Sequence, residues 1–203
     1  MVRRLWDSWE DDAVIRDRPT GRYIDREKVH YVDFEGRLFD VRGPSITPRP
    51  PQGQPIVAVK ANDDISTEFA ARRVDLVFVD GDVDEVRARR SAIRASATDA
   101  GRDADDISVL ATIPVSDAST PDEIATTLAD CFTSGSTDGF LLQPEVAPAR
   151  LGALIDRIVD DVLPALAERG LSTHDLRGTT FRERLGLAKP ANRYAAAAAG
   201  SPS

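Results

Sequence analysis

The chain has a single cysteine, only three lysines among its 26 basic residues, and no long apolar run. With Cys131 alone, no intrachain disulfide can form, and no Cys/His cluster has the spacing of zinc ligands. No segment approaches the roughly 18 consecutive apolar residues of a membrane-spanning helix, and the N-terminus lacks the apolar run of a signal peptide. We therefore expect a cytoplasmic protein without a metal site.

The charge balance is acidic, with a net charge of -8 and a pI near 4.8. Nucleic acids and anionic membranes both favour clustered lysine and arginine. Neither is expected as a partner. At 203 residues the chain is long enough for one ordinary core. We expect one domain over residues 1–190 and a disordered tail over residues 191–203.

The first quarter of the chain is irregular in its patterning. Apolar residues spaced by four, at Leu5, Trp9 and Ala13, predict a helix over residues 4–15. Alternating segments on either side of Glu35-Gly36, at 29–32 and 38–41, predict a hairpin. The proline-rich stretch from residue 44 to 55 predicts a loop without regular structure.

From residue 56 onward, strand and helix patterns alternate four times. The clearest helix start is Thr120-Pro-Asp-Glu123, which offers an N-cap, a proline at the first helical position and a capping-box glutamate. The predicted strands are 56–60, 76–79, 107–115 and 139–142, and the predicted helices are 66–73, 83–97, one after Thr120 and a long one from 151 to about 170. Four β/α units are typical of half of an eightfold barrel.

Several residues that could carry chemistry have a simpler structural interpretation. The run Asp80-Gly-Asp-Val-Asp84 imitates a calcium loop, but Glu85 and Ser91 stand where such a loop needs Gly and Glu, so we interpret it as a strand-to-helix turn. Cys131 is expected in the core. His30 and His174 have no carboxylate or nucleophile at a telling spacing. Neither histidine predicts a catalytic triad.

Four segments carry a family resemblance: Leu5–Asp12 with its Trp-Asp-Ser-Trp run, Val41–Pro44, Pro48–Gly53 and Arg177–Leu187. They resemble the flavin-dependent monooxygenases of the luciferase-like superfamily, in the branch of nitrilotriacetate and dibenzothiophene-sulfone monooxygenases. The resemblance covers about residues 5 to 190. It implies an α/β fold that is the C-terminal half of a (β/α)8 TIM-type barrel, whereas a complete barrel needs about 250 residues.

The resemblance also implies a chemistry: reduced FMN binds molecular oxygen and a small organic substrate is oxygenated. The family's first four strands have no counterpart here, and Val115 passes almost directly to Thr120, where the family has a long excursion. We interpret this as a remodelled gene. A half barrel has two open strand edges. We therefore expect a homodimer or a companion luciferase-like subunit, with a flavin reductase supplying reduced FMN.

The loop after the first of the four strands is the candidate cofactor site, at Lys60, Ala61, Asn62 and Asp63. By the resemblance, this loop holds the FMN phosphate at a helix N-terminus. The family's glycine falls on Ala61 and its phosphate-binding serine on Asp63, so a carboxylate faces the phosphate. Lys60 offsets part of that repulsion if its ammonium turns inward.

Three hypotheses follow from this sequence. The chain is a working oxidoreductase that completes a flavin site with another chain, a non-catalytic interaction subunit, or a degenerate remnant that no longer binds flavin.

Overall fold

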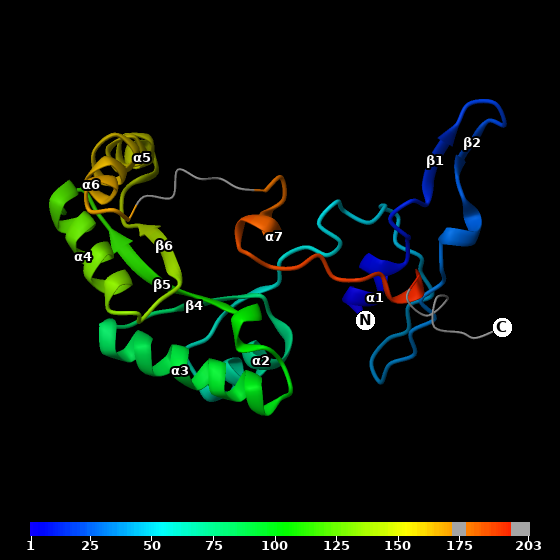
Figure 1. The fold of residues 1–203 in the computed structure, drawn as a ribbon, viewed down its shortest axis with the longest axis horizontal. Coiled ribbons are helices and arrows are strands. Elements are labelled where there is room, and N and C mark those ends of the chain that lie inside the picture. Colours follow the sequence, from blue (N-terminus) through cyan, green and yellow to red (C-terminus); the bar gives the residue numbers. More distant parts are fainter. Residues whose placement is uncertain (172–177, 196–203) are drawn as a thin grey trace. The chain divides into compact units, whose positions relative to one another are not determined.

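A computed structural model describes residues 1–171 and 178–195 (Figure 1). The chain divides into two compact units. One unit joins Met1–Pro55 to Arg177–Ser203, and the other is Ile56–Leu176. Within the described residues, no helix is both long and apolar enough to cross a membrane.

The second unit is built on a parallel sheet of four strands in the order β3-β4-β5-β6. The strands are β3 (Ala58–Lys60), β4 (Leu76–Val79), β5 (Ser108–Val115) and β6 (Gly139–Pro144). The helices between and after them are α2 (Asp64–Arg73), α3 (Val83–Asp99), α4 (Pro121–Thr133), α5 (Leu151–Arg157) and α6 (Leu163–Glu168). A π-helical turn, Ile158–Val162, connects α5 to α6. The predicted β/α alternation is confirmed.

Three of the helix starts in this unit are fixed by side chains that cap them. Asp63, Asp82 and Thr120 each form a reciprocal capping box at the start of α2, α3 and α4 respectively. The predicted start at Thr120 is confirmed. The run from Asp80 to Asp84 is the expected strand-to-helix turn, because Asp82 accepts bonds from the first backbone N–H groups of α3.

The helices pack against one face of the sheet. Side chains on that face are buried against α2 and α3 in one cluster and against α4, α5 and α6 in another. The strand residues in these clusters alternate, as period-two geometry requires: Val77, Val79, Val109, Ala111 and Val115. Cys131 of α4 is buried among the apolar residues, as expected.

The opposite face carries the alternate residues and contributes to neither described core cluster. Lys60, Phe78, Leu110 and Gly139 form one row across it, because the strand register places them side by side. Leu141 on the edge strand β6 is 38% exposed. A parallel sheet usually has both faces covered.

The first unit departs from two predictions. The helix expected over residues 4–15 is wrong: α1 spans Val2–Asp7, and the Ser8 hydroxyl donates back to the Leu5 carbonyl while accepting from the Ser45 N–H. After Ser8 the chain is extended enough for Trp9 to bridge Val29. A local side-chain bond has replaced helical continuation.

The predicted hairpin is present only as a short antiparallel pairing. Phe34 and Val41 exchange two backbone hydrogen bonds of 2.8 Å, and the Val32 N–H donates to the Arg42 carbonyl, but Asp33 adopts a positive φ of 39°, which interrupts an extended strand. The two-stranded sheet of this unit is instead β1 (Val14–Asp17) with β2 (Arg22–Ile24). A 3-10 turn, Arg26–Lys28, follows β2, and α7 (Phe181–Arg184) lies near the C-terminus.

A buried polar network holds distant segments of the first unit together. Asp7, 2% exposed, accepts from Arg49 Nε at 3.1 Å and from Gln54 Nε2 at 3.0 Å. Arg49 also donates to the Pro190 carbonyl at 2.6 Å, and Asn192 donates to the Asp7 carbonyl at 2.9 Å. Asn192 lies within the tail expected to be disordered, whose residues 196–203 fall outside the described residues.

The helix-side core gives a stability prediction. Leu154 is 2% exposed, and its neighbour Ile155 is 50% exposed on the same helix. Leu154→Ala should lower the free energy of unfolding by about 2–5 kcal/mol, because it leaves a cavity. Ile155→Ala is the matched control and should stay within about 0.5 kcal/mol of the unchanged chain in urea denaturation. Equal effects would contradict the described packing.

The polar network gives a second prediction. Arg49→Leu leaves the buried Asp7 carboxylate with only its longer pair, at 3.5 Å, to the half-exposed Arg193, so unfolding free energy should fall by roughly 3–5 kcal/mol. Arg22→Leu breaks the exposed ion pair of Arg22 with Asp25 and should change it by less than about 1 kcal/mol. Urea denaturation of both variants checks this, and a mild effect of Arg49→Leu would show that Asp7 is not held as described.

Candidate functional site

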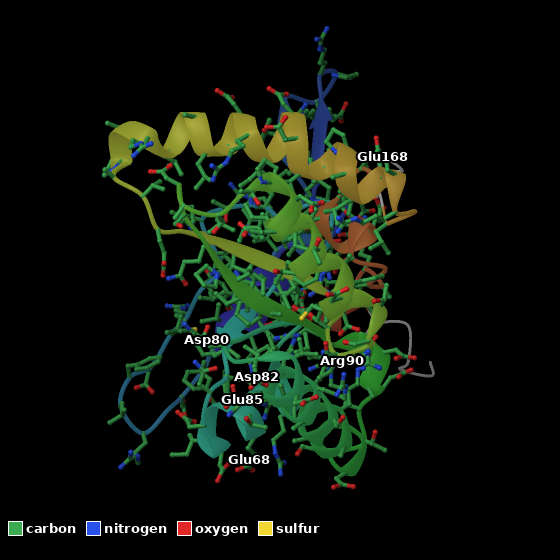
Figure 2. All side chains as sticks on the ribbon, turned by 90° about the vertical axis from the view of Figure 1, so that its left-hand side faces the viewer. Glu68, Asp80, Asp82, Glu85, Arg90 and Glu168 are labelled. Carbon is green, nitrogen blue, oxygen red and sulfur yellow. The ribbon has the colours of Figure 1, made fainter. Side chains whose placement is uncertain are left out.

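The candidate loop joins β3 to α2 at the carboxyl end of the sheet, where ligands bind in parallel α/β folds. Figure 2 labels the neighbouring acidic turn, with Asp80 after β4 and Asp82 and Glu85 at the start of α3. The four predicted residues, Lys60 to Asp63, follow one another here but have three different environments.

Asp63 caps helix α2. Its Oδ1 accepts from the Ser66 N–H and from the Ser66 hydroxyl, both at 2.7 Å, and Ser66 Oγ accepts from the Asp63 N–H at 3.2 Å. These bonds hold the pKa of the Asp63 carboxyl below its ordinary value. The Asp63 carboxylate therefore already accepts a hydrogen bond from one of the backbone N–H groups at the N-terminus of α2.

Lys60 pairs with Asp80. The Lys60 Nζ lies 2.6 Å from Asp80 Oδ2, and the Asn62 amide donates to the same oxygen at 2.8 Å. Asn62 Oδ1 in turn accepts from the Asp80 N–H at 3.2 Å. The bond from Lys60 is the main reason that the pKa of Asp80 is lowered. Asp80 was not predicted as a site residue. Its position directly after the buried strand β4 is the feature of the sequence that could have identified it.

Ala61 has a structural position. It is fully buried in the core under α2, and its backbone N–H donates to the Phe78 carbonyl at 2.9 Å. That N–H continues the β3–β4 ladder. Ala61 is thus a packing residue, and its small side chain suits the space between strand and helix.

Thr112 of β5 faces the same end of the sheet from the uncovered side. It is 8% exposed, and its Oγ1 has no close hydrogen-bond partner within the described part of the chain. The hydroxyl lies near enough to Asp80 to contribute to the lowering of that carboxyl's pKa. A buried hydroxyl beside a carboxylate is a polar group that a ligand could satisfy.

The histidines add no second site. His30 does have a carboxylate partner, contrary to the expectation: its Nε2 lies 2.7 Å from Glu10 Oε1, and its ring stacks on Tyr194 at 4.5 Å. These contacts connect the two ends of the first unit. His174 lies outside the described residues, and among the described residues no group of three or more His, Cys, Asp or Glu could hold a metal.

The family model described as "Luciferase-like monooxygenase" matches residues 1–200. The chain belongs to the luciferase-like monooxygenase family. It is similar to dibenzothiophene-sulfone monooxygenase of Rhodococcus erythropolis, with 31% identity across 95% of this chain and 44% of the relative. It is also similar to one of the two subunits of pristinamycin IIA synthase of Streptomyces pristinaespiralis, with 35% identity across 96% of this chain and 56% of the relative.

Solved structures of luciferase-like proteins share the fold. A long-chain alkane monooxygenase superposes with a TM-score of 0.80 at 25% identity, over 96% of this chain and 61% of that one. A riboflavin lyase with modified FMN and substrate riboflavin superposes with a TM-score of 0.79 at 26% identity, over 93% and 60%. The chain thus spans about half to two-thirds of the length of these relatives, and its α/β sheet corresponds to the C-terminal half of a TIM-type barrel.

The two carboxyls of the loop give a pH prediction. Their pKa values are lower in the fold than the ordinary value of about 3.9. The fold therefore favours their charged forms, and this stabilisation is present above the ordinary pKa and is lost as the pH falls through the lower folded values. The double variant Asp63→Asn with Asp80→Asn should lose less thermal stability between about pH 5 and pH 2 than the unchanged chain. Parallel melting curves would contradict the described bonds.

Proposed function

We propose that this chain supplies the carboxyl half of a flavin-dependent monooxygenase barrel and is inactive until further strands complete that barrel. The observation that carries the proposal is the sheet with helices on one face only. In the described residues, β3 pairs only with β4, and β6 pairs only with β5, so both edges present unpaired backbone groups.

The uncovered face resembles a barrel interior in chemistry as well as in position. Apolar and polar side chains mix across it: Lys60 is level with Phe78 and Leu110, and Thr112, in the next row toward the carboxyl ends, is level with Leu141. Barrel enzymes are packed in the middle and place their reacting groups at the carboxyl end. A second set of strands would bury the apolar side chains and cover the groups at that end.

The missing strands come either from a second copy of this chain or from a companion luciferase-like subunit. Relatives with names that denote multi-chain systems support this, among them both subunits of pristinamycin IIA synthase and a component of the nitrilotriacetate monooxygenase of Aminobacter aminovorans. A flavin reductase is the further partner that we propose, as the source of reduced flavin. The substrate is a small organic molecule.

The candidate cofactor residues are Lys60, Ala61, Asn62 and Asp63, at the helix end where a flavin side chain would terminate. The phosphate of FMN does not fit the loop as it is built, because Asp63 already occupies the helix N-terminus and Asp80 already neutralises Lys60. The same observation favours a second function, a non-catalytic accessory subunit that keeps the half barrel and has lost the cofactor.

The test is assembly in solution. The unchanged chain should form a dimer by light scattering, or remain an aggregation-prone monomer that enters a defined complex when a companion luciferase-like chain is added. Leu141→Glu places a charge on the uncovered face and should reduce that assembly at least about tenfold in association constant.

The matched control is Val159→Glu, which adds the same charge to an exposed position, 51% exposed, on the helical face. It should leave assembly unchanged. If Val159→Glu disrupts assembly and Leu141→Glu does not, the partner binds the helices and the barrel proposal is wrong. A well-behaved monomer that binds no companion chain at any concentration would also reject it.

A further inference from the structure

The lysine of the candidate loop and a backbone donor at the start of α2 are both already bonded to carboxylates. Lys60 Nζ pairs with Asp80 at 2.6 Å, and the Ser66 N–H donates to Asp63 at 2.7 Å. A phosphate dianion is held by excess positive charge or by free backbone donors. Neither of these two donors is free here.

The same groups suit hydroxyls. A carboxylate accepts about four hydrogen bonds, whereas a hydroxyl donates one and also accepts. Asp63 and Asp80 can therefore each accept a bond from a ligand hydroxyl without giving up the bonds that they now make. The buried Thr112 hydroxyl, which lacks a close partner, lies beside Asp80 and adds a donor and an acceptor at the same end of the sheet.

A known precedent separates these two ligand chemistries in dinucleotide sites. There an acidic side chain bonds the free ribose hydroxyl, whereas an arginine accommodates the phosphate that replaces it. Asp63 and Asp80 are acidic side chains of the first kind, and the lysine of the loop already pairs with Asp80.

We propose that this loop selects a flavin side chain that ends in a hydroxyl, as in riboflavin, over the phosphorylated side chain of FMN. The proposal rests on the proposed function, which brings a flavin to this end of the sheet. Asp63 and Asp80 are the residues that determine the specificity, and Thr112 bonds a hydroxyl of the ribityl chain.

The test is a competition between the two flavins. The purified full chain, in the assembly that it forms, is incubated with equimolar riboflavin and FMN, and the bound flavin is separated and identified by chromatography. The unchanged chain should retain riboflavin over FMN by about tenfold or more. Asp63→Asn should reduce that ratio about tenfold by strengthening FMN binding, since it removes the facing charge. Asp80→Asn should reduce it by a smaller factor, about two- to fivefold, since it only frees Lys60 from an exposed pair.

Asparagine caps helices as well as aspartate does, so Asp63→Asn removes the charge and keeps the N-cap. Circular dichroism should confirm that both variants are folded. Asp103→Asn is the matched control: Asp103 also caps a helical turn, Ala104–Asp106, but lies before the amino end of β5. Its flavin ratio should equal that of the unchanged chain.

Three results would overturn the proposal: preference of the unchanged chain for FMN, a ratio that neither variant changes, and retention of neither flavin. These results are distinct from a failure of the half-barrel proposal, because light scattering tests that proposal by the mass of the assembly and needs no flavin. If the chain assembles but prefers FMN, the half-barrel proposal stands and only the inferred preference for riboflavin is wrong.

Discussion

The period-two alternation of four parallel strands is the constraint on which the rest of the second unit depends. Once Val77 and Val109 lie against the helices, Phe78 and Leu110 must lie on the other face. The uncovered face is therefore as firmly specified as the core. Shifting any strand by one residue would exchange the two faces and place Lys60 under helix α2.

The same geometry determines what gathers at the carboxyl ends of the strands. Lys60 is level with Phe78 in the register, and Asp80 lies two residues further on, so both side chains belong to one face. Their ion pair follows from register and alternation together. Thr112, the residue two positions after Leu110 in β5, is on that face as well. Lys60 thus shares a row with Phe78 and Leu110, and Thr112 shares the next row with Leu141.

How much of this the sequence predicts differs between the two units. In the second unit, alternation and caps are local signals, so strands such as Leu76–Val79 and the helix start at Thr120 were predicted closely. In the first unit, the organising bonds join Asp7, Arg49 and Asn192, which are far apart in the chain and follow no period. The helix expected over residues 4–15 failed for that reason, since its polar residues bond other segments.

The candidate site shows the same division. The loop from Lys60 to Asp63 was found through the family resemblance, and Asp63 was recognised as an obstacle to phosphate. Asp80 was missed, because its partner Lys60 is 20 positions away in the sequence and becomes a neighbour only through strand pairing. Sequence reasoning identified the residue that is bonded locally and missed the one that is bonded across strands.

The two carboxylates do not contribute equally to excluding phosphate. Lys60 and Asp80 are 51% and 44% exposed, and such a surface pair contributes about 0.2–1 kcal/mol, so an incoming anion could compete for the lysine at small cost. Asp63 is different, because it bonds the backbone and side chain of Ser66 and so fixes both its position and the start of α2. An anion that approaches the start of α2 meets that fixed negative charge. Asp63 therefore sets the chemistry of the loop, and Asp80 adjusts it by deciding whether Lys60 is available.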